Sequence, residues 1–185
     1  MLKMNKALIS IIILTVFTSC IHQAPKPKCD VKPDNYTFGY KENNGYTIYH
    51  SIEPAKFCSK QTGRPILIMF AGWRNISDRH LFWDIFQDKD VKQIINDNFL
   101  LVMLFVDDTT RLSTVDSSKK TDSGKIIETV GEYNLNFEIK KFQINATPLF
   151  TIVDNNMNIL VEPIGFVTQK MKEQFVDFLM KGINK

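Results

Sequence analysis

Two continuous apolar runs constrain the fold of this chain more than any other feature of its sequence. The run RPILIMFAG covers residues 64–72, and the run LLVMLFVDD covers residues 100–108. A strand with one face in water alternates apolar and polar residues, whereas a strand covered on both faces is apolar throughout. Both runs therefore predict central strands of a sheet that carries helices on its two faces, which is an α/β architecture.

The segments around these runs alternate between strand and helix patterns. We expect a short strand at 46–51 and a helix at 52–61 that Ser51 caps and Gly63 terminates. A further helix should follow residue 77, capped by Ser77 or Asp78. A second short helix follows in 88–99, and a further helix lies in 126–144 with Val130, Tyr133, Phe137 and Ile139 on the sheet. A hairpin at 147–165 and a helix at 169–180 with an apolar stripe close the chain. This order predicts a mixed sheet with helices on both faces.

Length and charge set outer limits on domain count and on partners. The 185 residues, 44% of them hydrophobic and 14 of them Phe, suffice for one domain with appendages. The 23 basic and 20 acidic residues are interspersed, and the net charge is only +3. No basic stripe indicates nucleic acid as a partner.

The first residues form a segment of different character. Lys3 and Lys6 precede the apolar run ALISIIILTVF, which ends at TSC and is too short to span a bilayer. The segment resembles a bacterial lipoprotein signal, with Phe17 where Leu is usual, and the resemblance implies lipidation of Cys20. The alternative is a plain cleaved signal with an incidental cysteine. We predict a signal at 1–19, a Pro- and Lys-rich tether at 20–39 and a domain at 40–185 with an insertion at 107–128. The localisation would be the bacterial cell envelope, at the periplasmic or outer-membrane face.

Two cysteines remain once Cys20 is lipidated. Cys29 and Cys58 form an even pair in an exported, oxidising compartment, which favours a disulfide. Such a bond would close a loop of about 30 residues and contribute about 3 to 4 kcal/mol. The alternative is two unrelated thiols, with Cys58 buried on its helix.

Three stretches carry a family resemblance: RPILIMFAGW before a helix, VKQIINDNFLLVMLFVDD, and FQINATPLFTIVDNNMNILVEPIGF. Together they resemble the thioredoxin fold. More narrowly they are similar to the C-terminal thioredoxin-like domain of the transmembrane thiol:disulfide interchange (protein-disulfide reductase) family, including its versions in the Bacteroidetes. The similarity covers residues 52–182. It implies that Pro148, in the motif ATP, follows a cis peptide bond and lies beside the active site.

The same resemblance implies that the redox chemistry of this family has been lost. The two cysteines of its C-x-x-C motif fall on Arg74 and Ser77, and the buried Asp of many relatives falls on Ile68. Thiol exchange needs a low-pKa thiolate at a helix N-terminus and a resolving thiol one turn later. Neither thiol is present, so we predict a degenerate site without thiol–disulfide activity.

What the resemblance leaves is a peptide-binding groove. In thioredoxin-like proteins the loop after the Trp and the cis-Pro loop form a shallow surface, and the residue before the cis-Pro pairs with an extended substrate. Arg74 either binds a carboxylate or phosphate together with free backbone amides, or is a solvated side chain. Ser77 is expected to cap a helix rather than to act as a nucleophile. The binding residues we predict are Trp73, Arg74, Asn75, Ile76, Ser77, Thr147 and Pro148.

Other polar residues give no cofactor site. His22, His50 and His80 are scattered along the chain, so we predict neither a metal nor another cofactor. Asp107 and Asp108 end the second apolar run and could form an acid–base pair or bind a cation. The same Asp pair occurs in the resembled family, which favours a structural or surface role.

These observations predict a membrane-anchored, extracytoplasmic thioredoxin-like lipoprotein that lacks the redox pair. Its function would be non-catalytic, as a protein- or peptide-binding or accessory module of an envelope system for thiol–disulfide exchange or protein maturation. Two alternatives remain open: a redox protein that uses Cys29 and Cys58 instead, and a purely structural envelope protein.

Overall fold

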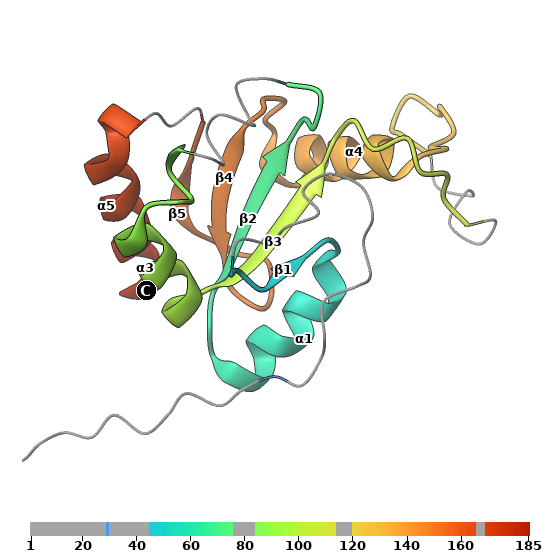
Figure 1. Ribbon diagram of the computed structural model, residues 1–185. Coiled ribbons are helices and arrows are strands. Elements are labelled where there is room, and N and C mark those ends of the chain that lie inside the picture. Colours follow the sequence, from blue (N-terminus) through green and yellow to red (C-terminus); the bar gives the residue numbers. More distant parts are fainter. Residues whose placement is uncertain (1–28, 30–44, 76–83, 114–119, 166–168) are drawn as a thin grey trace, which may run out of the picture.

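The computed structural model of the protein describes residues 29, 45–75, 84–113, 120–165 and 169–185 (Figure 1). The predicted signal and its Cys20, the site residues Ile76 and Ser77, and the start of the helix after Trp73 lie outside these ranges.

Five strands form one mixed sheet in the order β1-β3-β2-β4-β5. Strands β1 and β2 both pair in parallel with β3, whereas β4 pairs antiparallel with β2 and with β5. The strands are β1 (Ile48–Tyr49), β2 (Ile66–Ala71), β3 (Leu100–Phe105), β4 (Leu149–Val153) and β5 (Ile159–Ile164). The strand expected at 46–51 is thus reduced to two residues, while the two apolar runs become the adjacent strands β2 and β3.

Helices cover both faces of this sheet, as the two apolar runs predict. Helices α1 (Ile52–Thr62) and α4 (Val130–Phe142) lie on one face, and α3 (Lys89–Asn98) and α5 (Lys172–Ile183) lie on the other (Figure 1). A short 3-10 turn (Gln169–Met171) precedes α5. Gly63 ends α1 in the left-handed region with φ 69°.

The two central strands supply side chains to both layers of the core. All residues of β2 and of β3 are buried. Leu67, Met69 and Ala71 face the cluster under α3 and α5, and Ile66, Ile68 and Phe70 face the cluster under α1 and α4. Because successive side chains of a strand point to opposite faces, a strand buried on both faces has no position for a polar residue.

Helix α4 packs through a different stripe from the expected one. Tyr133 and Ile139, which we predicted to lie on the sheet, are exposed to 37% and 43%. The buried residues of α4 are instead Gly131, Asn134, Glu138 and Phe142. The prediction followed apolar residues alone and therefore missed a stripe whose two central members are polar.

Gly131 begins this stripe because the backbone of α4 lies very close to the backbone that follows β3. A Cβ on Gly131 would lie 2.6 to 2.8 Å from backbone atoms of Val106 and Asp108. Only glycine permits the first turn of α4 to lie this close to the chain that leaves β3. The N–H of Gly131 donates to the carbonyl of Asp108 at 2.9 Å, which fixes this contact.

Helix α1 also departs from the expectation at its start. Ser51 occupies the N-cap position, but its side chain makes no capping hydrogen bond. Helix α3, by contrast, is capped by the Asp88 carboxylate, which accepts the N–H groups of Asp90 and Val91.

Candidate functional site

Three loops emerge at the same edge of the sheet. Ala71 at the end of β2 lies beside Phe105 at the end of β3, and Phe70 lies opposite Leu149 at the start of β4. The segments that follow β2 and β3 and that precede β4 are therefore neighbours, and we call them the 72–75, 106–108 and 145–148 loops. This edge is where the described site residues predicted from the sequence come together.

Trp73 forms the apolar part of this edge. Its ring meets the ring of Phe105 edge to face, with centroids 6.2 Å apart and planes at 89°. The side chain is half-buried and packs on the core cluster under α3 and α5. One part of the indole is thus held by the core, and the remainder is exposed to solvent.

Asp107 holds the 72–75 loop in place. Its Oδ1 accepts the backbone N–H of Trp73 and its Oδ2 accepts the backbone N–H of Arg74, both at 2.8 Å. In the interpretation in which Arg74 binds an anion together with free backbone amides, these two amides are not free, because Asp107 accepts both.

Asp108 serves a separate backbone segment. It is buried, with 1% of its surface exposed, and its Oδ1 accepts the N–H of Thr110 at 2.8 Å. Its carbonyl accepts the N–H of Gly131. The two adjacent carboxylates therefore bind different loops, which agrees with a structural role for the Asp pair.

The 145–148 loop contributes the second wall of the site. The peptide bond between Thr147 and Pro148 is cis, as the resemblance implies. Pro148 is buried and Thr147 is half-buried. Within the described parts of the chain, the backbone N–H and C=O of Thr147 take part in no hydrogen bond. Such groups are available to pair with an added strand.

A buried carboxyl group lies behind this loop. Glu138 on α4 has no exposed surface, and its Oε1 accepts the N–H of Ala146 at 3.0 Å. Its Oε2 is buried without a hydrogen-bond partner in the described structure. Burial raises the pKa of Glu138 to about 7, against a smaller lowering by the Ala146 N–H.

Asn134, one turn earlier on α4, binds the end of β3. Its Nδ2 donates to the carbonyl of Phe105 at 2.9 Å. Asn134 and Glu138 thus connect one helix to two of the three site loops. Neither was predicted as a site residue, although the spacing of Gly131, Asn134, Glu138 and Phe142 fits one face of a helix and could have indicated them.

Of the seven predicted binding residues, five lie in the described loops at this edge: Trp73, Arg74, Asn75, Thr147 and Pro148. Arg74 is exposed, and no ion pair of its side chain joins it to another described residue. Ile76 and Ser77 lie outside the described residues. Across the described ranges, no cluster of three or more His, Cys, Asp or Glu side chains could hold a metal ion.

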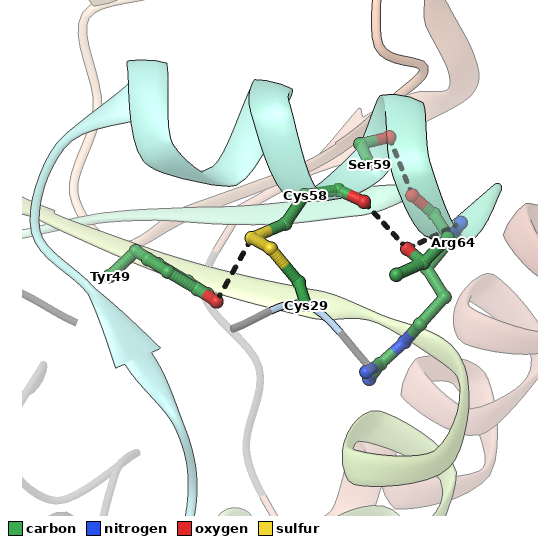
Figure 2. Close-up of a disulfide and its surroundings, with 6 residues drawn as sticks. Cys29, Tyr49, Cys58, Ser59 and Arg64 are labelled. Atoms are coloured by element: carbon green, nitrogen blue, oxygen red, sulfur yellow. Dashed lines mark hydrogen bonds between the residues drawn. A yellow bond between two sulfur atoms is a disulfide. The ribbon is translucent and has the colours of Figure 1, made fainter. Parts of the chain in front are cut away.

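Cys29 and Cys58 form the predicted disulfide, with Cα atoms 5.3 Å apart (Figure 2). Cys58 lies fully buried on α1, and the hydroxyl of Tyr49 contacts its sulfur at 3.5 Å. Burial raises the pKa of Tyr49, while nearby Arg64 lowers it. The bond therefore joins the segment before the domain to the first helix.

The disulfide lies away from the three-loop edge. A cavity of about 350 Å³ beside Cys29 is also lined by Arg64, Phe99 and Leu100. Arg64 and Leu100 lie where β2 and β3 begin, whereas Trp73 and Asp107 follow the ends of these strands. The guanidinium of Arg64 donates to the carbonyls of Asn96 and Phe99 and so binds the C-terminal end of α3.

No protein-family model matches this chain, and no curated protein matches it either. Among the described helices, none has the length and apolar character needed to cross a membrane.

Solved structures do match. A structure described as DsbH oxidoreductase superimposes with a TM-score of 0.54 at 14% identity, covering 80% of this chain and 95% of that chain. A thioredoxin from Thermus thermophilus gives 0.47 at 15% identity over 72% of this chain and 84% of that chain. A disulphide isomerase from Xylella fastidiosa Temecula1 gives 0.45 at 14% identity over 70% and 86%. The similarity to the oxidoreductase and the strand order together establish that this chain has a thioredoxin-like fold.

Proposed function

We propose that this protein is a non-catalytic thioredoxin-like module of the bacterial cell envelope that binds extended protein segments at the edge between Trp73 and Pro148. One observation carries the proposal. Thr147 presents an unpaired backbone N–H and C=O among the described residues, next to the loop of a half-buried Trp and without a cysteine at position 74 or 77.

Binding would occur by strand addition. An extended segment pairs its backbone with the N–H and C=O of Thr147, and the exposed part of the Trp73 ring contacts one of its side chains. Backbone pairing gives affinity without demanding a particular sequence, which suits an accessory factor for maturing envelope proteins. Thiol–disulfide systems and other protein-maturation systems of the envelope are the partners we propose.

Asp107 supports the non-catalytic assignment. In a redox site the first thiolate is stabilised at a helix N-terminus by backbone N–H groups. Here a carboxylate accepts the N–H of Arg74 itself. A negative charge at this place would disfavour a neighbouring thiolate even if one were present.

Membrane attachment through a lipidated Cys20 completes the proposal. Three acyl chains on one cysteine would hold the protein at a membrane surface, since each buried methylene contributes about 0.8 kcal/mol. Growth with radiolabelled palmitate should label the wild-type protein and leave Cys20→Ser unlabelled. A Cys20→Ser protein that retains the label would contradict this part of the proposal.

The binding function can be tested with a permanently unfolded probe, such as a reduced and carboxymethylated protein. We expect wild-type protein to bind the probe and Thr147→Pro to lose binding, because Pro removes the N–H at residue 147. Thr147→Val is the matched control, since it retains the backbone N–H. Equal binding by wild-type protein and Thr147→Pro would show that strand addition at Thr147 is not used.

A second candidate function is redox chemistry at the Cys29–Cys58 disulfide. The observation in its favour is that Cys29 is half-buried while Cys58 has the Tyr49 hydroxyl at its sulfur. A thiolate of a dithiol reductant would attack Cys29 Sγ, and Cys58 would leave as a thiolate that accepts a hydrogen bond from Tyr49. The second thiol of the reductant, as a thiolate, would then attack the mixed disulfide, close the disulfide of the reductant and release Cys29 as a thiolate.

Thiol counting separates these two functions. The protein is alkylated before and after graded reduction, and the modified cysteines are identified by mass spectrometry. Persistence of the disulfide under reductants that open glutathione disulfide indicates a structural cross-link and leaves binding as the function. Ready opening, together with insulin reduction that is lost in Tyr49→Phe, would favour the redox function.

A further inference from the structure

Glu138 is a buried titratable side chain directly behind the proposed binding edge. It is fully buried on α4, yet only one of its two carboxyl oxygens has a hydrogen-bond partner in the described structure. A buried polar atom without a partner is costly, and folded proteins rarely retain one without a reason. An apolar side chain of similar size would have packed at the same place without this cost.

The partner that Glu138 does have is part of the proposed binding edge. Its Oε1 accepts the N–H of Ala146, which is exposed and directly precedes Thr147. Within the described residues, this is the side-chain hydrogen bond that connects the 145–148 loop to a helix. Because one peptide unit separates the two residues, the bond at Ala146 sets where the N–H of Thr147 lies.

The surroundings of Glu138 contain no compensating charge in the described part of the chain. On α4 the adjacent cations Lys140 and Lys141 are exposed, and Lys140 pairs with Asp122. On the side of the sheet that carries this helix, β2 and β3 present apolar side chains, and β4 presents Leu149, Val153 and the buried hydroxyl of Thr151, which has no hydrogen-bond partner in the described structure. Tyr49 of β1 is the titratable group that this cluster contains besides the disulfide. From the 145–148 loop, the N–H of Ala146 faces the carboxyl.

We propose that Glu138 is a proton-responsive positioning residue, which fixes the 145–148 loop through Ala146 and makes the edge presented by Thr147 depend on pH. The binding consequence rests on the proposed function above. The anchoring of the loop does not, because it follows from the contact between Glu138 and Ala146.

The direction of the effect follows from the chemistry of the carboxyl group. A carboxylate accepts a shorter and stronger hydrogen bond from an amide than a neutral carboxyl does. Burial places the pKa of Glu138 at about 7, so both forms are populated near neutral pH. Ionisation on raising the pH should strengthen the bond to Ala146 and restrict the loop, whereas protonation should loosen it.

Solution NMR of the full chain tests the anchor directly. We would follow the side-chain carboxyl carbon of Glu138 and the backbone amides of Ala146 and Thr147 from about pH 5 to about pH 9. The expected result is one common midpoint near neutral pH, with the Ala146 amide proton moving downfield as the pH rises. Glu138→Gln should remove the titration of both amides, and Glu162→Gln, at an exposed position on β5, should leave it unchanged.

Binding of the carboxymethylated probe at both ends of this pH range provides the second readout. We expect the wild-type protein to bind the probe about five-fold more tightly at the higher pH. This factor corresponds to a difference of roughly 1 kcal/mol between charged and neutral hydrogen bonds. Binding by Glu138→Gln should not depend on pH.

Three results would decide against one claim or the other. An ordinary acidic midpoint for Glu138, or an Ala146 amide that does not follow it, would overturn the proposal. Equal probe binding at both pH values in the wild type would overturn the pH dependence of the edge. Absence of binding at every pH would reject the binding function, and the shared titration of Glu138 and Ala146 would then decide the anchor by itself.

Discussion

Asp107 Oδ2 lies 2.8 Å from the backbone nitrogen of Arg74, so a carboxylate that follows β3 is bound to the loop that follows β2. Its other oxygen holds Trp73 in the same way. These two backbone N–H groups of the 72–75 loop are therefore not open to a ligand, because a carboxylate of the same chain accepts both.

Replacing Asp107 should destabilise the 72–75 loop. In Asp107→Asn one acceptor oxygen becomes an NH₂ group that faces a backbone N–H, so one hydrogen bond is lost and two donors oppose each other. We expect the free energy of unfolding to fall by about 1 to 3 kcal/mol. Urea denaturation measures this free energy. Asp177→Asn is the control, because Asp177 forms only a surface ion pair with Lys181, and its replacement should change the free energy of unfolding by less than about 0.5 kcal/mol. Equal effects of the two substitutions would contradict the role of Asp107.

A cysteine introduced at position 74 should not have a lowered thiol pKa. In Arg74→Cys the carboxylate of Asp107 remains beside the new thiol and disfavours the thiolate, so we expect a thiol pKa of about 8.5 or above. Adding Asp107→Asn should lower this pKa. The rate of alkylation as a function of pH measures both values. A pKa near 7 or below with Asp107 intact would show that the carboxylate does not control this position.

Loss of the disulfide should reduce stability without moving the site. The bond closes a sequence separation of 29 residues, so Cys29→Ala/Cys58→Ala should lose about 3 to 4 kcal/mol of unfolding free energy. Cys29→Ala alone should lose nearly as much, since Cys29 is only half-buried. Urea denaturation gives these values, and the amide signals of Trp73 and Thr147 should remain in place. Displaced signals would show that the disulfide positions the site.

Glu138 should make stability decrease as the pH rises. Its folded-state pKa is raised from the ordinary 4.5 to about 7, so between these values the folded protein retains a proton that the unfolded chain has released. The free energy of unfolding should therefore fall across this range and level off above it, by roughly 3 kcal/mol at most. Denaturation at about pH 5 and about pH 8 should show this slope in the wild type and in Glu162→Gln, and a reduced slope in Glu138→Gln. An unchanged slope in Glu138→Gln would exclude Glu138 as its source.

At Gly131, helix α4 lies too close to the chain that follows β3 for any side chain to fit. In Gly131→Ala the new methyl group would meet backbone atoms of Asp108 and Val106 at 2.6 to 2.8 Å, which forces α4 away from the end of β3. We expect a loss of more than about 2 kcal/mol in unfolding free energy. Gly165→Ala is the matched control, because its Cβ would meet only the carbonyl of Pro148, at 3.8 Å. A similar small effect at both glycines would mean that α4 can shift freely.

Much of the architecture was predictable from local patterns. The runs at 64–72 and 100–108 are apolar at every strand position, and this can be satisfied only in a sheet covered on both faces. The cis bond before Pro148 followed from the resemblance, and the pairing of Cys29 with Cys58 from the cysteine count.

The packing of α4 was not predictable in this way. Tyr133 and Ile139 are apolar enough to suggest a core face, but the helix turns them outwards and buries Asn134 and Glu138. The reason is that these two polar side chains reach backbone groups of Phe105 and Ala146. Apolar periodicity contains no information on partners so far away in the sequence.

The sequence by itself determined the α/β class, the two central strands and the absence of a cysteine pair after Trp73, because each depends on residue type and local order. Only the tertiary structure decided that Asp107 accepts the amides of the 72–75 loop and that Glu138 lies buried behind the 145–148 loop. Both are hydrogen bonds between segments brought together by strand register, and register is a property of the assembled sheet.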